Sequence, residues 1–203
     1  MIRGTTRVTC PNCGAQSECT LVQTVDTREN PADKARLLAG ELNVLACTAC
    51  EERTQLAVQV LYIDRRDSGD VYIQVCPGGD EALEQGAAAF AASGVSGTRR
   101  VVPSLNALVE KVKIADAGLE DWAIEMTKVL LLASITELDR VLLFDELEGD
   151  TIRWLLLDGE VVERLSSARS SYDRLCHRAP PREVLVDRAW AVPVVRDMIE
   201  RAN

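Results

Sequence analysis

The first hundred residues are dominated by short runs in which apolar and polar positions alternate, and Thr and Val are frequent in them. This pattern predicts strands, because successive side chains of a strand point to opposite faces. The predicted strands cover residues 5–9, 17–25, 41–46, 53–64 and 71–75, and the last two form a hairpin. Asn30 and Pro31 begin an inserted helix that Gly40 ends, and a second, Ala-rich helix starts at Asp80.

The second half has longer helical periods. Apolar residues at helical spacing predict a helix from Ser104 to Gly118 and a second, buried one from Glu120. Two apolar strands at 140–147 and 151–157 form a hairpin, and 161–165 and 184–186 are predicted to extend its sheet. Residues 167–178 are predicted to be helical, and Pro193 is predicted to open a final helix.

These elements predict an α+β protein of two domains. The loop at 93–97 separates an N-terminal antiparallel β domain with a helical insertion (1–97) from a C-terminal α+β domain with a small antiparallel sheet (98–203). A length of 203 residues and a hydrophobic content of 47% suit two packed cores. The sequence shows no apolar run near the ~20 residues of a membrane span and no secretory leader pattern, so we expect a cytoplasmic protein.

The cysteines are the most informative residues. Cys10 and Cys13 form one Cys-x-x-Cys pair, and Cys47 and Cys50 form another. Two such pairs place four thiolates around one tetrahedral Zn²⁺, which leaves no open position and makes the metal structural. The sequence therefore predicts a zinc-ribbon-like first domain with structural Zn²⁺ on these four residues. Metal-free, degenerate pairs and redox-active dithiols remain as alternatives.

Other chemically active residues carry weaker patterns. Cys19 and Cys76 lie on predicted strands, where a buried cysteine is the expected role, although either could replace a ligand. Cys176 and His177 are adjacent and point in different directions on a helix, so they do not form a nucleophile and base. The acidic residues at a predicted turn are expected to be solvated; they are Asp145, Glu146, Glu148 and Asp150. We therefore expect a protein that is not an enzyme.

Several segments together resemble the CpXC domain of bacteria and archaea, which is named for its paired Cys-Pro-x-Cys motifs. The resemblance begins with Cys10-Pro11-Asn12-Cys13 and departs from the pattern at the second pair, which has Thr48 for Pro and Glu51 for Gly. The other matching segments are 37–44, 47–50, 62–64, 73–77, 108–112 and 118–121. The resemblance implies a cysteine-ligated domain and no particular reaction.

Charge and motif together favour an adaptor or regulatory protein that binds a protein partner or a second copy of itself. The chain has 23 Lys and Arg against 32 Asp and Glu, and the resulting net charge of -9 opposes nucleic-acid binding. Three tryptophans could anchor an interface, although aromatic residues are more often core: Trp122, Trp154 and Trp190. A nucleic-acid-binding ribbon is the first alternative, through Arg3, Arg7, Arg28, Lys34 and Arg36. Thiol-based redox sensing, with ejection of zinc on oxidation, is the second.

Overall fold

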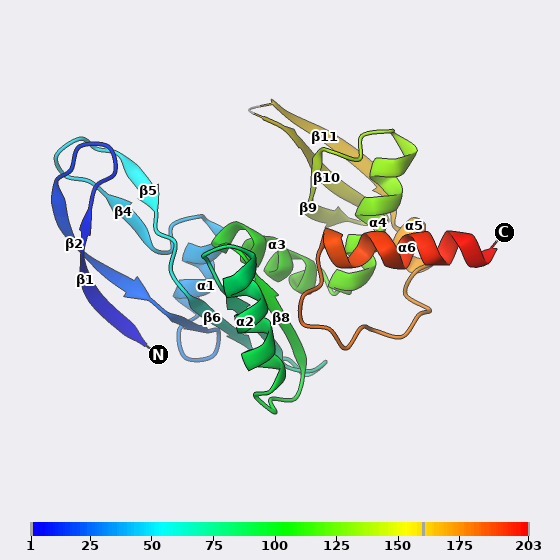
Figure 1. The fold of residues 1–203 in the computed structure, drawn as a ribbon, viewed down its shortest axis with the longest axis horizontal. Coiled ribbons are helices and arrows are strands. Elements are labelled where there is room, and N and C mark those ends of the chain that lie inside the picture. The colour runs from blue at the N-terminus through cyan, green and yellow to red at the C-terminus, as the bar shows by residue number, and fades with distance from the viewer. Residues whose placement is uncertain (1, 160, 203) are drawn as a thin grey trace. The chain divides into compact units, whose positions relative to one another are not determined.

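The computed structural model describes residues 2–159 and 161–202 of a mixed α+β chain (Figure 1). Two compact units divide after Val109, within the helix α3 (Leu105–Asp116). The sequence prediction put the division at 97–98, before the strand β8 (Thr98–Val102). Because β8 pairs with a strand of the first unit, that unit continues past this point.

The first unit carries two small antiparallel ribbons. Strands β1 (Arg3–Thr9) and β2 (Gln16–Val22) form one, and β4 (Val44–Ala46) and β5 (Arg53–Gln55) form the other. We call residues 2–22 and 43–56 the cysteine arm. Its buried apolar cluster is small and consists of Cys10, Leu45 and Cys47, with a few half-buried neighbours.

The remainder of the first unit is a four-stranded sheet in the order β3-β6-β7-β8. Its other strands are β3 (Thr24–Asp26), β6 (Val60–Asp64) and β7 (Val71–Val75). The predicted hairpin of β6 and β7 is antiparallel, whereas β3 with β6 and β7 with β8 are parallel. Parallel neighbours need crossover connections, and the helices α1 (Pro31–Leu38) and α2 (Asp80–Ala91) lie in these connections.

The strand predicted over 53–64 is wrong in one respect. Its two ends belong to different sheets, because β5 pairs with β4 in the cysteine arm and β6 pairs with β3 and β7 in the body. The intervening residues 56–59 are in neither strand, and Leu56 donates its N–H to the Asn43 carbonyl at 2.9 Å. The alternating sequence pattern therefore extends across the point at which the chain leaves one sheet and enters the other.

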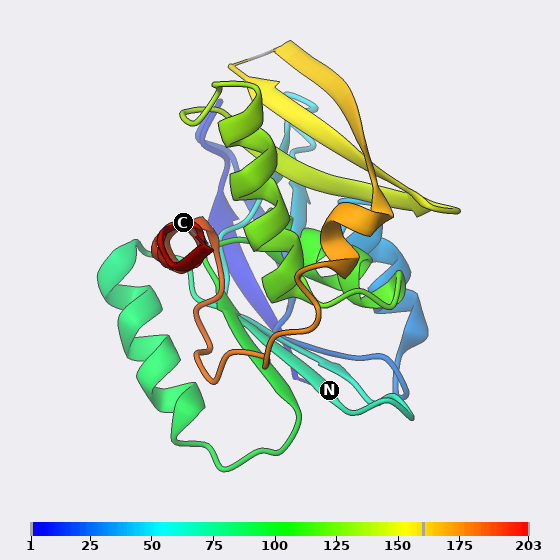
Figure 2. The ribbon, with the colours of Figure 1, turned by 90° about the vertical axis from the view of Figure 1, so that its right-hand side faces the viewer.

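The second unit packs helices on a three-stranded antiparallel sheet. Its strands are β9 (Val141–Glu148), β10 (Thr151–Asp158) and β11 (Val161–Ala168), in the order β11-β10-β9. The helices α4 (Asp121–Ser134) and α6 (Arg188–Ala202) pack on one another, and α4 lies over one face of the sheet (Figure 2). Phe144 and Trp154 meet edge to face in this core, with ring centroids 6.2 Å apart.

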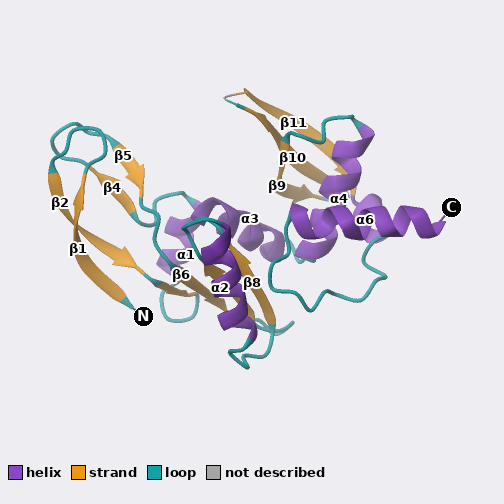
Figure 3. Cartoon of the chain, in the orientation of Figure 1, coloured by secondary structure: helices purple, strands orange, loops and turns teal. Residues whose placement is uncertain are grey.

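The end of the chain differs from its sequence prediction. Strand β11 continues to Ala168, so only the short helix α5 (Arg169–Asp173) forms in the region predicted as helix 167–178. A long loop leads to α6 and contains 184–186, which are not a strand (Figure 3). Helix α6 begins before Pro193 because the Asp187 carboxylate accepts the N–H of Trp190 at 3.0 Å and caps an earlier turn.

Buried charges join α3 and α4, and the sequence analysis missed them. Lys111 contacts the carboxylates of Asp121 and Glu125 at 3.0 Å each, and Lys128 contacts Glu110 at 2.7 Å. Burial raises the pKa of Glu125, but the two lysines outweigh it and hold that pKa below its usual range. The apolar spacing predicted both helices, but an ionisable residue within such a pattern does not reveal which distant charge it will contact.

Candidate metal centre

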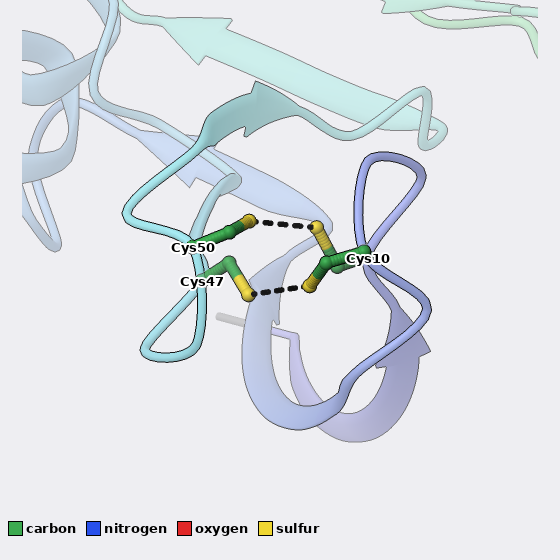
Figure 4. Close-up of side chains that lie close together, drawn as sticks. Cys10, Cys47 and Cys50 are labelled. Atoms are coloured by element: carbon green, nitrogen blue, oxygen red, sulfur yellow. Dashed lines mark hydrogen bonds between the residues drawn. The ribbon is translucent and has the colours of Figure 1, made fainter.

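The four predicted ligands lie on two turns of the cysteine arm. Cys10 and Cys13 occupy the turn between β1 and β2, and Cys47 and Cys50 occupy the turn that follows β4. Figure 4 shows the side chains of Cys10, Cys47 and Cys50 directed into the space between the two turns. The structure therefore brings together residues that are more than 30 positions apart in the chain.

The sulfur atoms have the spacing of a tetrahedral site. The Cys10 and Cys50 sulfurs are 3.7 Å apart, those of Cys13 and Cys47 are 3.6 Å apart, and all four lie within 4.8 Å of one another. Metal–sulfur bonds of about 2.3 Å in a tetrahedron require sulfurs about 3.8 Å apart. All four are free thiols, since these separations far exceed the roughly 2.05 Å of a disulfide. They could hold one metal ion.

The first turn shows the backbone geometry that brings two sulfurs to one side. The N–H of Cys10 donates to the Ala15 carbonyl at 2.8 Å, and the N–H of Gly14 donates to the Cys10 carbonyl at 2.9 Å. Gly14 has φ +75°, a left-handed conformation that glycine adopts without steric cost.

The second turn repeats this geometry with a less suitable residue. The N–H of Cys47 donates to the Glu52 carbonyl, and the N–H of Glu51 donates to the Cys47 carbonyl, both at 2.9 Å. Glu51 stands where the first turn has Gly14, and it adopts φ +60°. A left-handed non-glycine residue costs about 1–2 kcal/mol, so the second turn is strained where the sequence departs from the repeated pattern.

The thiols of the four cysteines differ in acidity. Backbone N–H groups of Ala49 and Cys50 lower the pKa of Cys47 to about 7, so this thiol ionises readily near neutral pH. A backbone hydrogen bond at Ala15 lowers the pKa of Cys13, but the sulfurs of Cys50 and Cys47 outweigh it and raise that pKa above its usual value. Metal binding must displace the protons that remain on the other thiols.

A buried asparagine connects the two ribbons, and sequence reasoning did not single it out. The Asn43 side chain accepts the N–H of Val22 at 2.8 Å and donates to the Val22 carbonyl at 2.9 Å. Its own carbonyl accepts the N–H of Leu56 at 2.9 Å. Asn43 thus joins the end of β2 to the start of β4 and holds the bases of both cysteine ribbons. Its position four residues before Cys47 was the available indication.

The other cysteines lie outside this cluster, which is the only group of metal-binding side chains found among the described residues. Cys19 borders the small core of the arm, and Cys76 is buried at the end of β7 with its pKa raised by burial. Cys176 packs against the core of the second unit, and its pKa is likewise raised by burial.

The basic residues considered for nucleic-acid binding are mostly engaged with carboxylates. Arg3 contacts the buried Asp33 at 2.8 Å, Arg36 contacts the same carboxylate at 3.4 Å, and Lys34 contacts Asp64 at 3.5 Å. On the exposed ribbon, Arg7 faces Glu18 across the strands at 3.9 Å. Arg28 is exposed. Of these contacts, the one between Arg3 and Asp33 joins the cysteine arm to the body, and the others lie within one or the other.

The remaining candidates have structural surroundings. Trp122 and Trp154 are buried in the core of the second unit, and Trp190 packs against that core half-buried. Three of the four acidic residues lie on β9 and are paired with cations: Asp145 with Lys113, and Glu146 and Glu148 with Arg153. The fourth, Asp150, is exposed in the turn between β9 and β10. No helix in the described ranges has the length and apolar character that crossing a membrane requires.

The fold and the site define an α+β protein with a four-cysteine candidate metal centre on a two-ribbon arm. The CpXC protein family matches residues 8–128, which is more than half of the chain and includes all four cysteines. The chain belongs to this family, as its sequence resemblance predicts. No curated protein and no solved structure matched it significantly.

Proposed function

We propose that this chain is a non-enzymatic zinc-binding adaptor whose cysteine arm is stabilised by the metal and serves protein–protein interaction. The observation that carries the proposal is the arrangement of four sulfurs at tetrahedral spacing. Four thiolates are the ligand set that zinc prefers in closed structural sites. With all positions occupied by protein, such a zinc has none left for water or substrate.

The arm needs this metal more than the body does. Its buried apolar cluster holds only three residues, two of which are themselves candidate ligands. The β1 strand is exposed over nearly its whole length, so the ribbon gains little from burial. A two-stranded ribbon without a hydrophobic face is marginal in water. Metal binding therefore supplies the folding free energy of the arm, in the way known for small zinc domains.

The charge of the arm favours a protein partner over nucleic acid. Four thiolates exceed the positive charge of zinc, so the loaded centre is a net anion. The other charges of the arm balance, because its three arginines are matched by three glutamates, Glu18, Glu51 and Glu52. Phosphate backbones are repelled by such a surface. The thiols must be reduced to bind metal, which suits the cytoplasm.

Metal content in the native full-length chain tests the proposal. We expect one zinc per chain by native mass spectrometry in the wild type and in the control Cys176→Ser, and none in Cys47→Ser or Cys10→Ser. Hydrogen exchange on the same variants should show loss of protection in the arm and retention in β6 and β7. Wild-type protein purified without chelator or oxidant that contains no metal would overturn the zinc assignment.

The two alternative functions, redox sensing and nucleic-acid binding, predict different results. Metal release under mild peroxide, reversed by a thiol reductant, would favour redox sensing. Salt-dependent binding to DNA or RNA that is lost in Arg7→Ser would favour a nucleic-acid ribbon.

A further inference from the structure

The three-stranded sheet of the second unit has one protected edge and one open edge. At β9, the Glu110 carboxylate of α3 accepts the N–H of Phe144 at 2.5 Å, and Lys113 contacts Asp145 at 3.1 Å. The pairing of β9 with β10 also shifts between Arg153 and Trp154, an irregularity of the kind that ends strand pairing. Helix α3 therefore blocks this edge.

The other edge belongs to β11, and no described strand pairs with its outer side. Its pairing with β10 is regular over eight residues. The strand contains neither proline nor lysine, the residues that commonly block an edge. Val161 and Val162, at its start, are two adjacent exposed apolar residues, 57% and 56% exposed.

We propose that β11 pairs antiparallel with β11 of a second copy of this chain, about a two-fold axis at Leu165, to form a continuous six-stranded sheet. The inference goes beyond the proposed function: it concerns the second unit alone and does not depend on the metal centre.

The side-chain alternation of β11 restricts the possible registers. Val162, Arg164 and Ser166 lie opposite Leu157, Leu155 and Arg153 of β10, on the face turned away from the core. Leu165 lies opposite the buried Trp154 and packs half-buried against the core. Residues that face each other across a two-fold axis point to the same side of the sheet, so the axis must pass through a residue position.

Charge selects among these positions. An axis at Glu163 or Arg164 would set that residue against its own copy, which is unfavourable. Of the positions that remain, Leu165 lies nearest the middle of β11, so an axis there pairs the most residues. It sets Arg164 opposite Ser166 of the second copy and brings the two half-buried Leu165 side chains together. Glu163 would weaken an edge as an inward charge, but Arg140 contacts it at 3.2 Å and balances it.

Two substitutions at the exposed Ser166 test this register, because one should weaken the dimer and the other should strengthen it. Ser166→Arg sets arginine opposite Arg164 twice in the dimer, whereas Ser166→Glu sets two carboxylates opposite two guanidinium groups. Each cross-strand pair of this kind contributes roughly 0.2–1 kcal/mol, so the dimer dissociation constant should rise about 2- to 30-fold for arginine and fall by a similar factor for glutamate. Ser134→Arg, the same charge change at the exposed end of α4, should leave it unchanged.

Sedimentation of the full-length chain over a range of concentrations measures these constants. We expect a wild-type dimer, a weaker Ser166→Arg dimer, and recovery when Arg164→Glu is added to Ser166→Arg. Thermal unfolding of each variant identifies any that fails to fold. A monomeric wild type, or equal effects of arginine and glutamate at 166, would overturn the pairing.

The metal content of the same samples, measured by native mass spectrometry, tests the zinc proposal separately. Because β11 and the cysteine arm belong to different units, Cys47→Ser should lose metal and still form the β11 dimer. A monomeric wild type that holds one zinc per chain would refute only the strand pairing, and a metal-free dimer would refute only the zinc centre.

Discussion

Asn43 offers the sharpest test of how the metal centre is assembled. Its side chain makes two hydrogen bonds to the backbone of Val22, and the two residues are 3% and 1% exposed. Asn43→Ala removes both bonds and leaves a buried N–H and a buried carbonyl of Val22 without these partners. It also places alanine at φ +54°, a conformation that asparagine tolerates better.

The cost can be worked out from these contacts. A buried backbone group left without a partner costs about 1–3 kcal/mol, and left-handed alanine adds about 1 kcal/mol. With both the N–H and the carbonyl of Val22 affected, we expect Asn43→Ala to destabilise the arm by about 3–7 kcal/mol. Zinc binds the folded arm, so the cost of folding the arm is subtracted from the free energy of zinc binding. When the arm is mainly unfolded without zinc, a loss of about 3 kcal/mol in its folding free energy lowers the apparent zinc affinity roughly 100-fold.

Competition with a chromophoric chelator measures the zinc affinity, and hydrogen exchange locates the change in the arm. Asn43→Gly serves as a second variant, because it loses the same hydrogen bonds without the cost of a left-handed alanine and should fall between the wild type and Asn43→Ala. The exposed Asn106 of α3 provides the control, and Asn106→Ala should leave zinc affinity unchanged. Wild-type zinc affinity and wild-type arm protection in Asn43→Ala would refute the role assigned to this side chain.

Further substitutions address the second cysteine turn and the two cores. Glu51→Gly should stabilise the zinc-loaded arm by about 1 kcal/mol because it relieves a left-handed residue, and a lower unfolding temperature would contradict this. Glu125→Gln should cost about 1–3 kcal/mol at pH 7 in urea unfolding, because Lys111 and Lys128 lose a shared buried carboxylate but keep Asp121 and Glu110. The wild-type contribution of Glu125, whose folded pKa is lowered, is present above about pH 4 and is lost as the pH falls through that pKa, so the variant should lack this acid-sensitive part. Gly86→Ala should destabilise the first unit by about 1–3 kcal/mol, because an added Cβ would lie 2.3 Å from the Cys76 sulfur, and Cys76→Ala should restore much of the loss.

Local sequence determined the features that depend on a few neighbouring residues. The spacing of Cys10 and Cys13, with Gly14 after them, is sufficient to form a tight turn with two sulfurs on one side. Pro31 similarly places the start of α1, as the sequence predicts; Asn30 stands at the N-cap, but its side chain donates to the Asp33 carboxylate at 2.7 Å and makes no cap bond to the backbone. The family resemblance also follows from such short segments.

Tertiary structure decided what depends on partners far along the chain. The alternating pattern of 53–64 cannot reveal that its ends join different sheets, because strand pairing is set by burial against distant residues. The clamp between Asn43 and Val22 and the buried contacts of Lys111 are likewise invisible in sequence, since a polar residue shows its partner only after folding. The blocked edge of β9 depends on Glu110 and Lys113 of α3, whose position packing fixes.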